Sequence, residues 1–479
     1  MIGREKESAE LLRLYEREEA QLVAIYGRRR VGKTYLVDET FRDRITFRHA
    51  GLSPVEEGEQ PQGQPLKKQL RAFYYSLLSQ GKEREHCPKD WLEAFFMLEM
   101  HLQSIDDGTR QIVFLDELPW MDTPKSGFIT AFESFWNSWA CHRNVMVIIS
   151  GSANSWIKDK LINNHGGLYG RVTYEIKLEP FTLRESEMLF KERGVALSRY
   201  DIVQSYMIFG GIPFYLNYFQ RGLSFAQNVD DLFFSKGARL CSEFDRLFSS
   251  VFTNPDMMKN IVKVLSSKSM GFTRKEISEK TGVKEGGGLT DALNALIASD
   301  FVVKYIPFGK GRRECLYKLT DPFCIFYLRF VEKHDTLPDG FWQQNVASQP
   351  IVSWRGYAFE NVCFSHIPQI KRALGISGIS STQAAWTKRA EGERGTQIDL
   401  IISRKDNIVN MCEIKFYSDV FAADKKHDLR VRSRREMLGE VIPKKSAVHS
   451  TLITTYGIKE NEYRWVFDNV ITMDDLFSE

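Results

Sequence analysis

The sequence predicts an α/β protein whose N-terminal part is a parallel β-sheet covered by helices on both faces. Three short runs, at residues 21–26, 111–115 and 145–149, are apolar almost without interruption, and helical patterns separate them. Strands of this kind are buried on both faces, which is typical of parallel sheets. A second group of strand-like segments near the C-terminus predicts a further α/β domain.

The composition is that of a globular protein with several cores. The chain has 479 residues, of which 43% are hydrophobic and 27% charged, so disorder of the whole chain is excluded. At about 150 residues per domain, this length predicts about three domains. The seven dispersed cysteines form no CxxC pair, and the N-terminus lacks a signal-peptide pattern, so we expect a cytoplasmic protein. No long uncharged apolar run exists, so we expect no membrane partner.

The middle of the chain contains two regions with different predicted secondary structure. Helices dominate from about residue 181 to 255, which predicts a helical lid. Residues 256–335 then predict three helices, with a turn at Gly286–Gly288, and a β-hairpin, the pattern of a winged helix-turn-helix. Basic residues in its wing and recognition segment favour binding to phosphates, although an intramolecular lid fits equally. These residues are Lys275, Lys280, Lys284, Lys310, Arg312 and Arg313.

A phosphate-binding motif, the Walker A pattern, follows the first apolar run. Residues 27–34 read GRRRVGKT and match GxxxxGK[ST], with a strand before them and a helix after them. The glycines let backbone N–H groups turn towards phosphate, and the helix adds its positive end. Lys33 is expected to reach the β- and γ-phosphates of ATP, and Thr34 to ligate Mg²⁺. The cofactor-binding residues predicted here are Gly27, Arg28, Arg29, Arg30, Val31, Gly32, Lys33 and Thr34, and the three arginine side chains are expected to face solvent or another domain.

Two carboxylates end the second apolar run, the Walker B pattern. Residues 112–115 are followed directly by Asp116 and Glu117. Asp116 is predicted to hold the Mg²⁺ shell, and Glu117 to orient or activate the attacking water. Because this pair favours water as the nucleophile, we expect an ATPase, converting ATP and water to ADP and phosphate, in preference to a kinase.

On these residues the chain resembles the prokaryotic AAA+-type P-loop ATPases of the STAND-related archaeal family. The resemblance rests on Gly3-Arg4-Glu5, on the loop GRRRVGKT and on LDELPW at residues 115–120, and it covers about residues 1–330. It implies a polar sensor at Ser150 or Ser152. It also implies that Arg171 stabilises charge on the transferring phosphoryl group, although a surface arginine before a strand is equally common.

A second constellation lies near the C-terminus. Asp399 starts one strand candidate, and Glu413 and Lys415 lie in the next, the D-x(n)-E-x-K arrangement of restriction-type nucleases. Because side chains alternate along a strand, Glu413 and Lys415 share a face. Asp399 and Glu413 are predicted to hold one or two Mg²⁺ ions, Lys415 to position or activate water, and Glu360, on a preceding helix, to be a further acidic ligand. The strand candidates of this region are 397–402, 409–415, 450–453 and 464–467.

These features resemble the PD-(D/E)XK-like domain that is often fused to this ATPase family. Such domains cleave DNA or keep the fold as a binding or assembly module, and the sequence leaves both open. A basic helix follows the two strands, either as a DNA-binding surface or as a solvated face balanced by acidic neighbours. With a formal net charge of only +3, any nucleic-acid surface must be local. The basic residues are Lys425, Lys426, Arg430, Arg432, Arg434 and Arg435.

The favoured function is an ATP-hydrolysing switch coupled to a nuclease-like domain that acts on DNA. The alternative is a STAND-type regulatory or signalling ATPase whose C-terminal domain only binds DNA or protein. We expect ATP and Mg²⁺ as cofactors and DNA as a partner, and the sequence also allows a homo-oligomer. The predicted domains are an ATPase core at 1–180, a helical lid at 181–255, a winged helix at 256–335 and a restriction-endonuclease-like α/β domain at 340–479.

Overall fold

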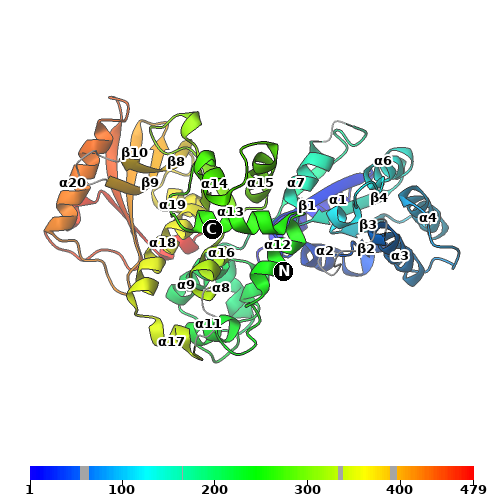
Figure 1. Ribbon diagram of the computed structural model, residues 1–479, viewed down its shortest axis with the longest axis horizontal. Helices are drawn as coiled ribbons and strands as arrows, with labels where there is room; N and C mark the ends of the chain where they lie inside the picture. Colours follow the sequence, from blue (N-terminus) through cyan, green and yellow to red (C-terminus); the bar gives the residue numbers. More distant parts are fainter. Residues whose placement is uncertain (54–63, 164–165, 333–337, 389–395) are drawn as a thin grey trace. The chain divides into compact units, whose positions relative to one another are not determined.

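The computed structural model describes residues 1–53, 64–163, 166–332, 338–388 and 396–479 (Figure 1). Within these ranges no helix is both long and apolar enough to cross a bilayer. The predicted boundary between residues 335 and 340 lies partly outside the described residues. The chain divides into two compact units, one made of Met1–Pro180, Asp245–Met258 and Asp291–Asp300, the other of Phe181–Phe244, Lys259–Thr290 and Phe301–Glu479.

The first unit is built on the predicted parallel sheet. Its five strands lie in the order β2-β3-β4-β1-β5, and every neighbouring pair is parallel. All residues of β1, β3 and β4 are buried, because helices cover both faces. The predicted α/β fold with a parallel sheet is confirmed. The strands are β1 (Gln21–Tyr26), β2 (Phe47–Ala50), β3 (Gln111–Asp116), β4 (Val145–Gly151) and β5 (Tyr174–Lys177).

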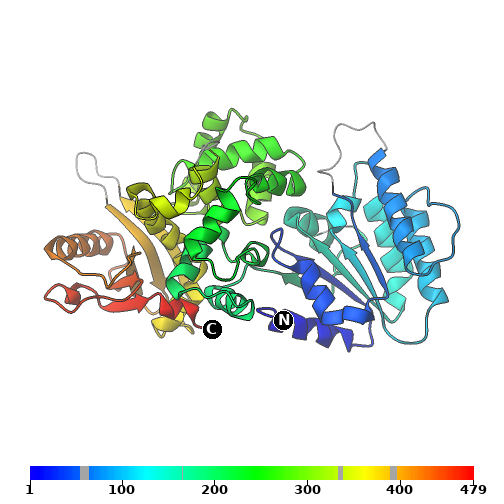
Figure 2. The same cartoon turned by 90° about the horizontal axis from the view of Figure 1, so that it is seen from below.

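Helices pack on one side of this sheet (Figure 2). Their aromatic side chains form a large part of the hydrophobic core there. The ring of Phe95 lies 5.2 Å from that of Phe135 and 5.9 Å from that of Phe128, between centroids. Such pairs contribute about 0.5–1.5 kcal/mol each beyond the burial of their surface. The helices of the unit's first 180 residues are α1 (Glu5–Tyr15), α2 (Lys33–Phe41), α3 (Gln64–Ser79), α4 (Trp91–Ser104), α5 (Leu118–Met121), α6 (Phe128–Ser138) and α7 (Asn154–Ile157).

Capping residues determine where several helices of the second unit begin and end. The side chains of Thr182, Ser224 and Thr273 each accept a hydrogen bond from the backbone N–H three residues later, and a Glu or Gln there completes the capping box. Gly210, with φ of 61°, ends α9 in the left-handed conformation that glycine adopts easily. The helices around residues 181–255 are α8 (Leu183–Glu192), α9 (Arg199–Phe209), α10 (Pro213–Leu216), α11 (Phe225–Phe233) and α12 (Glu243–Val251).

Three further helices are followed by two short antiparallel strands. β6 (Val302–Tyr305) pairs with β7 (Leu316–Leu319), and their register joins Val302 to Leu319. The turn predicted at Gly286–Gly288 is wrong in part, because Gly287 and Gly288 form the first turn of a helix. The helices are α13 (Pro255–Ser266), α14 (Arg274–Thr281) and α15 (Gly287–Ala298).

A mixed five-stranded sheet forms the C-terminal part of the second unit. Its order is β12-β11-β10-β9-β8, with antiparallel pairs at β8–β9–β10 and parallel pairs at β10–β11–β12. The parallel pair β10–β11 needs a crossover, which α20 supplies. The strand expected at 464–467 is wrong, since Arg464–Val466 is a 3₁₀ turn, and β8 was not predicted. The elements are α16 (Pro322–Phe326), α17 (Phe341–Asn345), α18 (Gln349–Ser365), α19 (Ile367–Ala373), β8 (Ser381–Lys388), β9 (Thr396–Arg404), β10 (Ile408–Lys415), α20 (Lys425–Gly439), β11 (Ala447–Thr454) and β12 (Asn469–Thr472).

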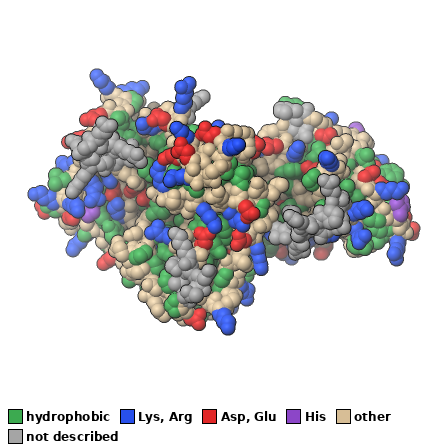
Figure 3. All heavy atoms as spheres, viewed as in Figure 1, with side chains coloured by type: hydrophobic (Ala, Val, Ile, Leu, Met, Phe, Trp, Pro, Cys, Tyr) green, Lys and Arg blue, Asp and Glu red, His purple; other side chains and the backbone are tan. Residues whose placement is uncertain are grey.

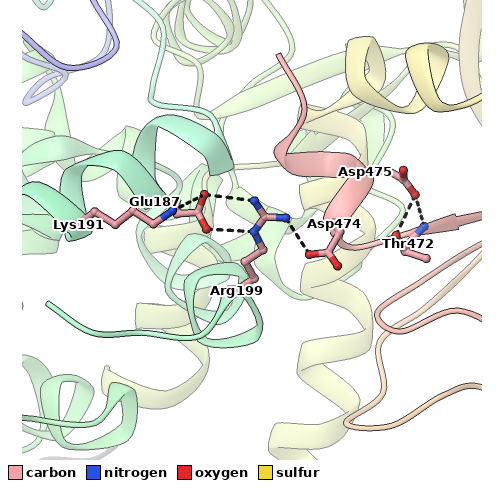
Figure 4. A network of polar contacts seen from close by, with 6 residues as sticks. All are labelled: Glu187, Lys191, Arg199, Thr472, Asp474 and Asp475. Atoms are coloured by element: carbon pink, nitrogen blue, oxygen red, sulfur yellow. Dashed lines mark hydrogen bonds and ion pairs between the residues drawn. The ribbon is translucent and has the colours of Figure 1, made fainter.

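The C-terminal end of the chain is tied to α8 and α9 inside the second unit (Figure 4). The guanidinium of Arg199 forms ion pairs with Glu187 and Asp474, each with a 3.0 Å contact. The same group lies 4.6 Å from the ring centroid of Phe477. Residues that are 275 positions apart in sequence therefore lie side by side in one unit.

Candidate functional site

The loop after β1 depends on two glycines. A Cβ atom on Gly27 would lie 2.3 Å from the carbonyl oxygen of Leu178, so no larger residue fits without movement of the backbone. Gly32, with φ of 97°, precedes the first turn of α2 in a conformation that L side chains rarely adopt. The Gly27 N–H donates to Oδ1 of Asn154 at 2.9 Å. The start of the loop is therefore held against the segments that follow β4 and β5.

Lys33 lies inside this loop and is bonded to it. Its Nζ donates to the carbonyl oxygens of Gly27 at 3.1 Å and Arg28 at 3.4 Å, and to Oγ of Ser152 at 2.8 Å. Burial lowers the pKa of Lys33, while the carboxylates of Glu117 and Asp116 oppose that effect. The lysine is thus a buried cation whose hydrogen-bond partners are neutral oxygens.

The two residues predicted to hold Mg²⁺ are brought together. The Thr34 hydroxyl donates to Oδ2 of Asp116 at 2.7 Å, across the gap between α2 and the end of β3. The other carboxylate oxygen of Asp116 accepts a hydrogen bond from the Ser150 hydroxyl. Hydroxyl and carboxylate oxygens are the ligands that Mg²⁺ prefers, so the chemistry of this pair fits the ion.

The carboxylate of Glu117 is hydrogen-bonded to Ser152, the residue directly after β4. Its backbone has φ of 46° and ψ of 49°, a conformation that costs about 1–3 kcal/mol and is typical of functional positions when a non-glycine residue adopts it. Its carboxylate accepts from the Ser152 N–H at 2.9 Å and the Ser152 hydroxyl at 2.5 Å. Because Ser152 also accepts from Lys33, one hydroxyl links the Walker A lysine to the Walker B glutamate. The two sensor candidates thus differ: Ser150 contacts Asp116, and Ser152 contacts Glu117.

The remaining predicted residues of the nucleotide site have different surroundings. Arg28 is buried, so of its two expected surroundings, solvent or another domain, it does not face solvent. Arg29 is half-buried, with its guanidinium 5.5 Å from the ring centroid of Trp120. Arg30 is half-buried with φ of 73°, and Val31 is fully buried. Arg171 is exposed on the turn before β5, and its side chain makes no polar contact with any residue that the structure describes.

Two residues that support the loop were not predicted in this role. Arg4 is buried, and its Nη2 donates to the carbonyl oxygens of Val31 at 3.1 Å and Glu179 at 2.7 Å. Asn154 is fully buried, and besides accepting from Gly27 its Nδ2 donates to the carbonyl of Ala298 at 2.8 Å. Arg4 drew notice only as part of a resemblance, and a single asparagine after a strand carries no signal of such a contact.

Comparison with known proteins agrees with this geometry. Residues 1–219 match a family described as an ATPase domain predominantly from Archaea. This part of the chain is an ATPase domain of the archaeal type. The match extends beyond the first unit into α8, α9 and α10, so these helices belong to the ATPase domain.

Similar proteins extend over most of the chain. An uncharacterized protein of Methanocaldococcus jannaschii is 24% identical over 441 residues, which cover 91% of this chain and 92% of the relative. The Walker-type ATPase of Pyrococcus abyssi is 19% identical with a TM-score of 0.46, over 69% of this chain and 96% of its own. The ORC2 protein of Aeropyrum pernix is 12% identical with a TM-score of 0.41, over 73% and 96%.

The residues predicted as a nuclease-type site near the C-terminus also lie close together. Asp399 on β9 accepts from the Ile414 N–H of β10 at 3.2 Å. Glu413 is 7% exposed, and Lys415 lies 2.7 Å from its Oε1. Arg434 of α20 forms a second ion pair with Glu413, so this basic residue faces inward and not towards solvent.

Burial and neighbouring charges shift the pKa values of the carboxylates in this cluster. Burial and, to a smaller extent, the charge of Asp399 raise the pKa of Glu360 to about 7, while Lys318 and Lys415 oppose the rise. Burial also raises the pKa of Asp399. Burial acts on Glu413 in the same direction, but Lys415 and Arg434 outweigh it, so its pKa is lowered.

This cluster does not fit a metal ion as it stands. Among the described residues no group of three or more His, Cys, Asp or Glu side chains is placed to hold one. Glu360, Asp399 and Glu413 share the cluster, yet Glu413 already has two cationic partners. Lys318 was not predicted as a member of the cluster, because it lies on β7, far from the motif in sequence.

The basic residues predicted to touch DNA divide into two groups. Figure 3 shows Lys and Arg side chains on the part of the surface that carries α20. Lys425, Lys426 and Arg432 are exposed, although Arg432 pairs with Asp428 at 2.9 Å. In the hairpin loop, Lys310 pairs with Glu314 at 2.8 Å. The exposed basic residues of α20, which include Arg435, therefore offer a cationic surface in the C-terminal part.

Proposed function

We propose that the chain is an ATP-hydrolysing switch whose ATPase domain controls a C-terminal domain of PD-(D/E)XK type that acts on DNA. The observation that carries the ATPase half is the linked set Lys33, Ser152 and Glu117 beside the pair Thr34 and Asp116. A cation, a carboxylate for water and two oxygen ligands converge at the loop, as phosphoryl transfer to water requires.

Each residue has a separate task in this proposal. Lys33 exchanges its carbonyl partners for phosphate oxygens of ATP, while backbone N–H groups of residues 27–34 surround the phosphates. Thr34 and Asp116 hold Mg²⁺, which neutralises charge on the phosphate oxygens when bound. Glu117 turns from Ser152 to accept a proton from the attacking water. We propose that Arg171, which is exposed on the turn before β5, stabilises charge on the transferring phosphoryl group in an assembled state.

The C-terminal half rests on Asp399, Glu413 and Lys415, which adjoin on β9 and β10. We propose these as the nuclease-type residues, with Glu360 as the additional acid. We further propose that α13–α15 and the β6–β7 hairpin are a winged helix that serves as an intramolecular lid. The Phe308 N–H, in the hairpin loop, donates to the carbonyl of Ala385 on β8 at 3.2 Å, which supports the lid over a free DNA-binding wing.

The alternative is a regulatory ATPase whose C-terminal domain only binds DNA or protein. The ion pairs of Glu413 with Lys415 and Arg434 favour it, because a neutralised carboxylate is a poor ligand. In this case Asp399 and Glu413 stabilise the sheet and catalyse nothing.

The deciding experiment incubates the purified full chain with plasmid and linear DNA, with Mg²⁺ or Mn²⁺, and with ATP, a non-hydrolysable analogue or no nucleotide. The proposal expects cleavage that Asp399→Asn abolishes and ATP hydrolysis that this variant retains. Asp419→Asn, an exposed carboxylate in the loop after β10, is the matched control and should cut like the parent. A parent that binds duplex DNA and cuts none under any condition would establish the alternative.

A further inference from the structure

One tryptophan of the C-terminal part lies on the surface. Trp465 is 76% exposed, and among the described residues no other large apolar side chain is as exposed. Every other tryptophan of the chain is buried or half-buried. Because an indole is large and apolar, leaving it in water forgoes stability that burial would supply. The open indole is a flat surface that a ligand with a flat face can cover.

The backbone and a neighbouring arginine hold this indole in place. Trp465 lies in the 3₁₀ turn Arg464–Val466, and Val466 and Phe467 are part of the hydrophobic core of the C-terminal sheet. The guanidinium of Arg464 lies 4.8 Å from the ring centroid of Trp465, and its Nη1 donates to the carbonyl oxygen of Phe467 at 3.2 Å. A fixed cation therefore covers one face of the indole, and the exposure of the side chain leaves the other face open to solvent.

The segment that carries Trp465 runs along α20. Before the tryptophan, Asn461 donates from Nδ2 to the carbonyl oxygen of Ala423, close to the start of the helix, at 2.8 Å. After it, Asp468 forms an ion pair with Arg435 of the helix at 3.8 Å. Between these two connections, the turn with Trp465 packs against α20 itself. The open indole therefore lies beside the basic helix.

The positive charge at this place comes from the helix. Residues 425–439 contain six Lys or Arg and two Asp or Glu, whereas residues 459–468 contain two and three. A phosphate backbone is attracted to Lys and Arg, so it is expected along α20 and not along the segment with the tryptophan. The two segments together thus offer separate places for phosphates and for a flat ring.

Two arginines of α20 are suited to hold the phosphates. Arg432 and Arg435 are exposed and three residues apart, so they share a face of the helix, and the pair of Arg435 with Asp468 shows that this face adjoins the neighbouring segment. Arg432 pairs with Asp428 at 2.9 Å. Ion pairs at the surface contribute little to stability, so a phosphate competes with these carboxylates for the arginines.

We propose that Trp465 and the exposed basic face of α20 bind single-stranded DNA, with an unpaired base stacked on the indole and phosphates held by Arg432 and Arg435. Stacking on an aromatic side chain requires the flat face of a base, which a duplex keeps inside its own stack. An exposed indole distinguishes this surface from one that binds duplex DNA through phosphate contacts alone. The inference names the strand type for the C-terminal domain, and it rests on the proposed action on DNA.

The test measures fluorescence anisotropy of labelled oligonucleotides with the full chain, in EDTA and without nucleotide, so that no strand is cut. Oligo(dT) is compared with a duplex and with an abasic strand, which has phosphates but no bases. Trp465→Ala should weaken oligo(dT) binding by about tenfold, the size of one stacked base, and leave duplex and abasic binding unchanged. Trp465→Phe keeps an aromatic face and should retain most of the affinity. Tyr169→Ala, which removes a 70% exposed ring from the first unit, is the matched control and should bind like the parent.

The three nucleic acids separate the possible outcomes. Equal oligo(dT) affinity in the parent and Trp465→Ala would overturn the proposal, and so would an equal loss on the abasic strand, because the indole then acts without a base. If Trp465→Ala melts early, Trp465→Leu, which keeps apolar bulk without a flat ring, carries the same expectation. A parent that binds duplex DNA but not oligo(dT) overturns this inference alone. A parent that binds neither overturns the proposed action on DNA as well.

Discussion

At the scale of single residues, the nucleotide site is organised around a serine hydroxyl. Ser152 accepts from Lys33 and donates to Glu117, so the cation meant for phosphate and the carboxylate meant for water share one partner. Hydrogen bonds that involve charged groups contribute about 1.5–3 kcal/mol each, so this arrangement is a stable resting state of the site. ATP has to break it in order to engage either residue.

The first prediction separates binding from hydrolysis. Glu117→Gln preserves size and hydrogen bonding but cannot accept a proton from water, so ATP should still bind while turnover falls by ~10²-fold or more. Lys33→Ala should instead weaken ATP binding itself, because the variant lacks the ammonium that is expected to reach the β- and γ-phosphates. Calorimetric titration with a non-hydrolysable analogue and a phosphate-release assay distinguish the two effects.

Exposed residues of the same types provide the controls. Lys6→Ala on α1 and Glu192→Gln on α8 should leave both binding and turnover as in the parent. If Glu117→Gln hydrolyses ATP as fast as the parent, Glu117 is not the residue that activates water, and another carboxylate has this role.

A second prediction concerns the turn of the loop. Gly27→Ala places a Cβ 2.3 Å from the carbonyl oxygen of Leu178, so the loop or the segment after β5 must move. We expect ATP binding to be abolished and the free energy of unfolding to fall by roughly 1–3 kcal/mol. Gly356→Ala, inside α18 with no atom close to its Cβ position, is the contrast and should raise stability by about 0.5–1 kcal/mol. Denaturant unfolding of both variants measures this difference.

At the scale of elements, helices of the second unit are joined by a buried histidine. His366, directly after α18, accepts from the Leu183 N–H through Nε2 at 3.1 Å, while its Nδ1 lies 2.8 Å from the carbonyl of Val362. The neutral ring with its proton on Nδ1 satisfies both bonds. Burial lowers the pKa of His366 to about 4. The start of α8 therefore depends on an uncharged imidazole.

The third prediction follows from that shift. Because the folded-state pKa lies below the unfolded value of 6.5, the unfolded chain binds more protons between about pH 4 and 6.5. The stability from the neutral ring is complete above pH 6.5 and declines as the pH falls towards 4, by roughly 3 kcal/mol. His366→Gln should flatten this pH dependence of the free energy of unfolding. An identical slope in parent and variant would contradict the assignment, since the carboxylates titrate alike in both.

Strands that are apolar along their whole length could be predicted from the sequence, whereas the strand β8 at the edge of the C-terminal sheet could not. β1, β3 and β4 are buried on both faces, so their sequences identify them directly. β8 lies at the sheet edge and reads STQAAWTK, which has no clear alternation. Glycines are poor helix formers, so the sequence predicts a turn at Gly286–Gly288, yet Gly287 and Gly288 lie in the first turn of α15.

Site residues divide in the same way. Motif residues such as Asp116 and Glu413 are identified by local spacing, and the structure brings Asp116 to Thr34 and Glu413 to Lys415. Arg4 contacts Glu179 across 175 residues of sequence, and Lys318 of β7 lies 5.3 Å from the ring centroid of Tyr357 on α18. Contacts of this kind depend on the tertiary fold, and no local sequence pattern predicts them.

At the scale of the whole molecule, the second unit combines segments from several parts of the chain. It contains α8–α11, the β6–β7 hairpin and the C-terminal sheet, and Arg199 ties the last turn of the chain to α8. The family match ends at residue 219, inside this unit. The family match therefore includes helices α8–α10 of the unit that also holds the carboxylate cluster.

The last prediction tests what the C-terminal part binds. Lys425, Lys426 and Arg432 are exposed on α20, whereas Arg434 is committed to Glu413. Replacing Lys425, Lys426 and Arg432, three of the exposed basic residues of this helix, by alanine should weaken duplex DNA binding. It should also reduce the slope of log K against log salt by about 0.9 for each phosphate that is no longer neutralised. Lys6, Lys67 and Arg71, exposed on α1 and α3, form the matched triple and should leave the slope unchanged. Equal slopes for both triples, measured by fluorescence anisotropy from about 50 to 200 mM salt, would mean that α20 is a solvated face and that the cluster beside it serves a protein partner.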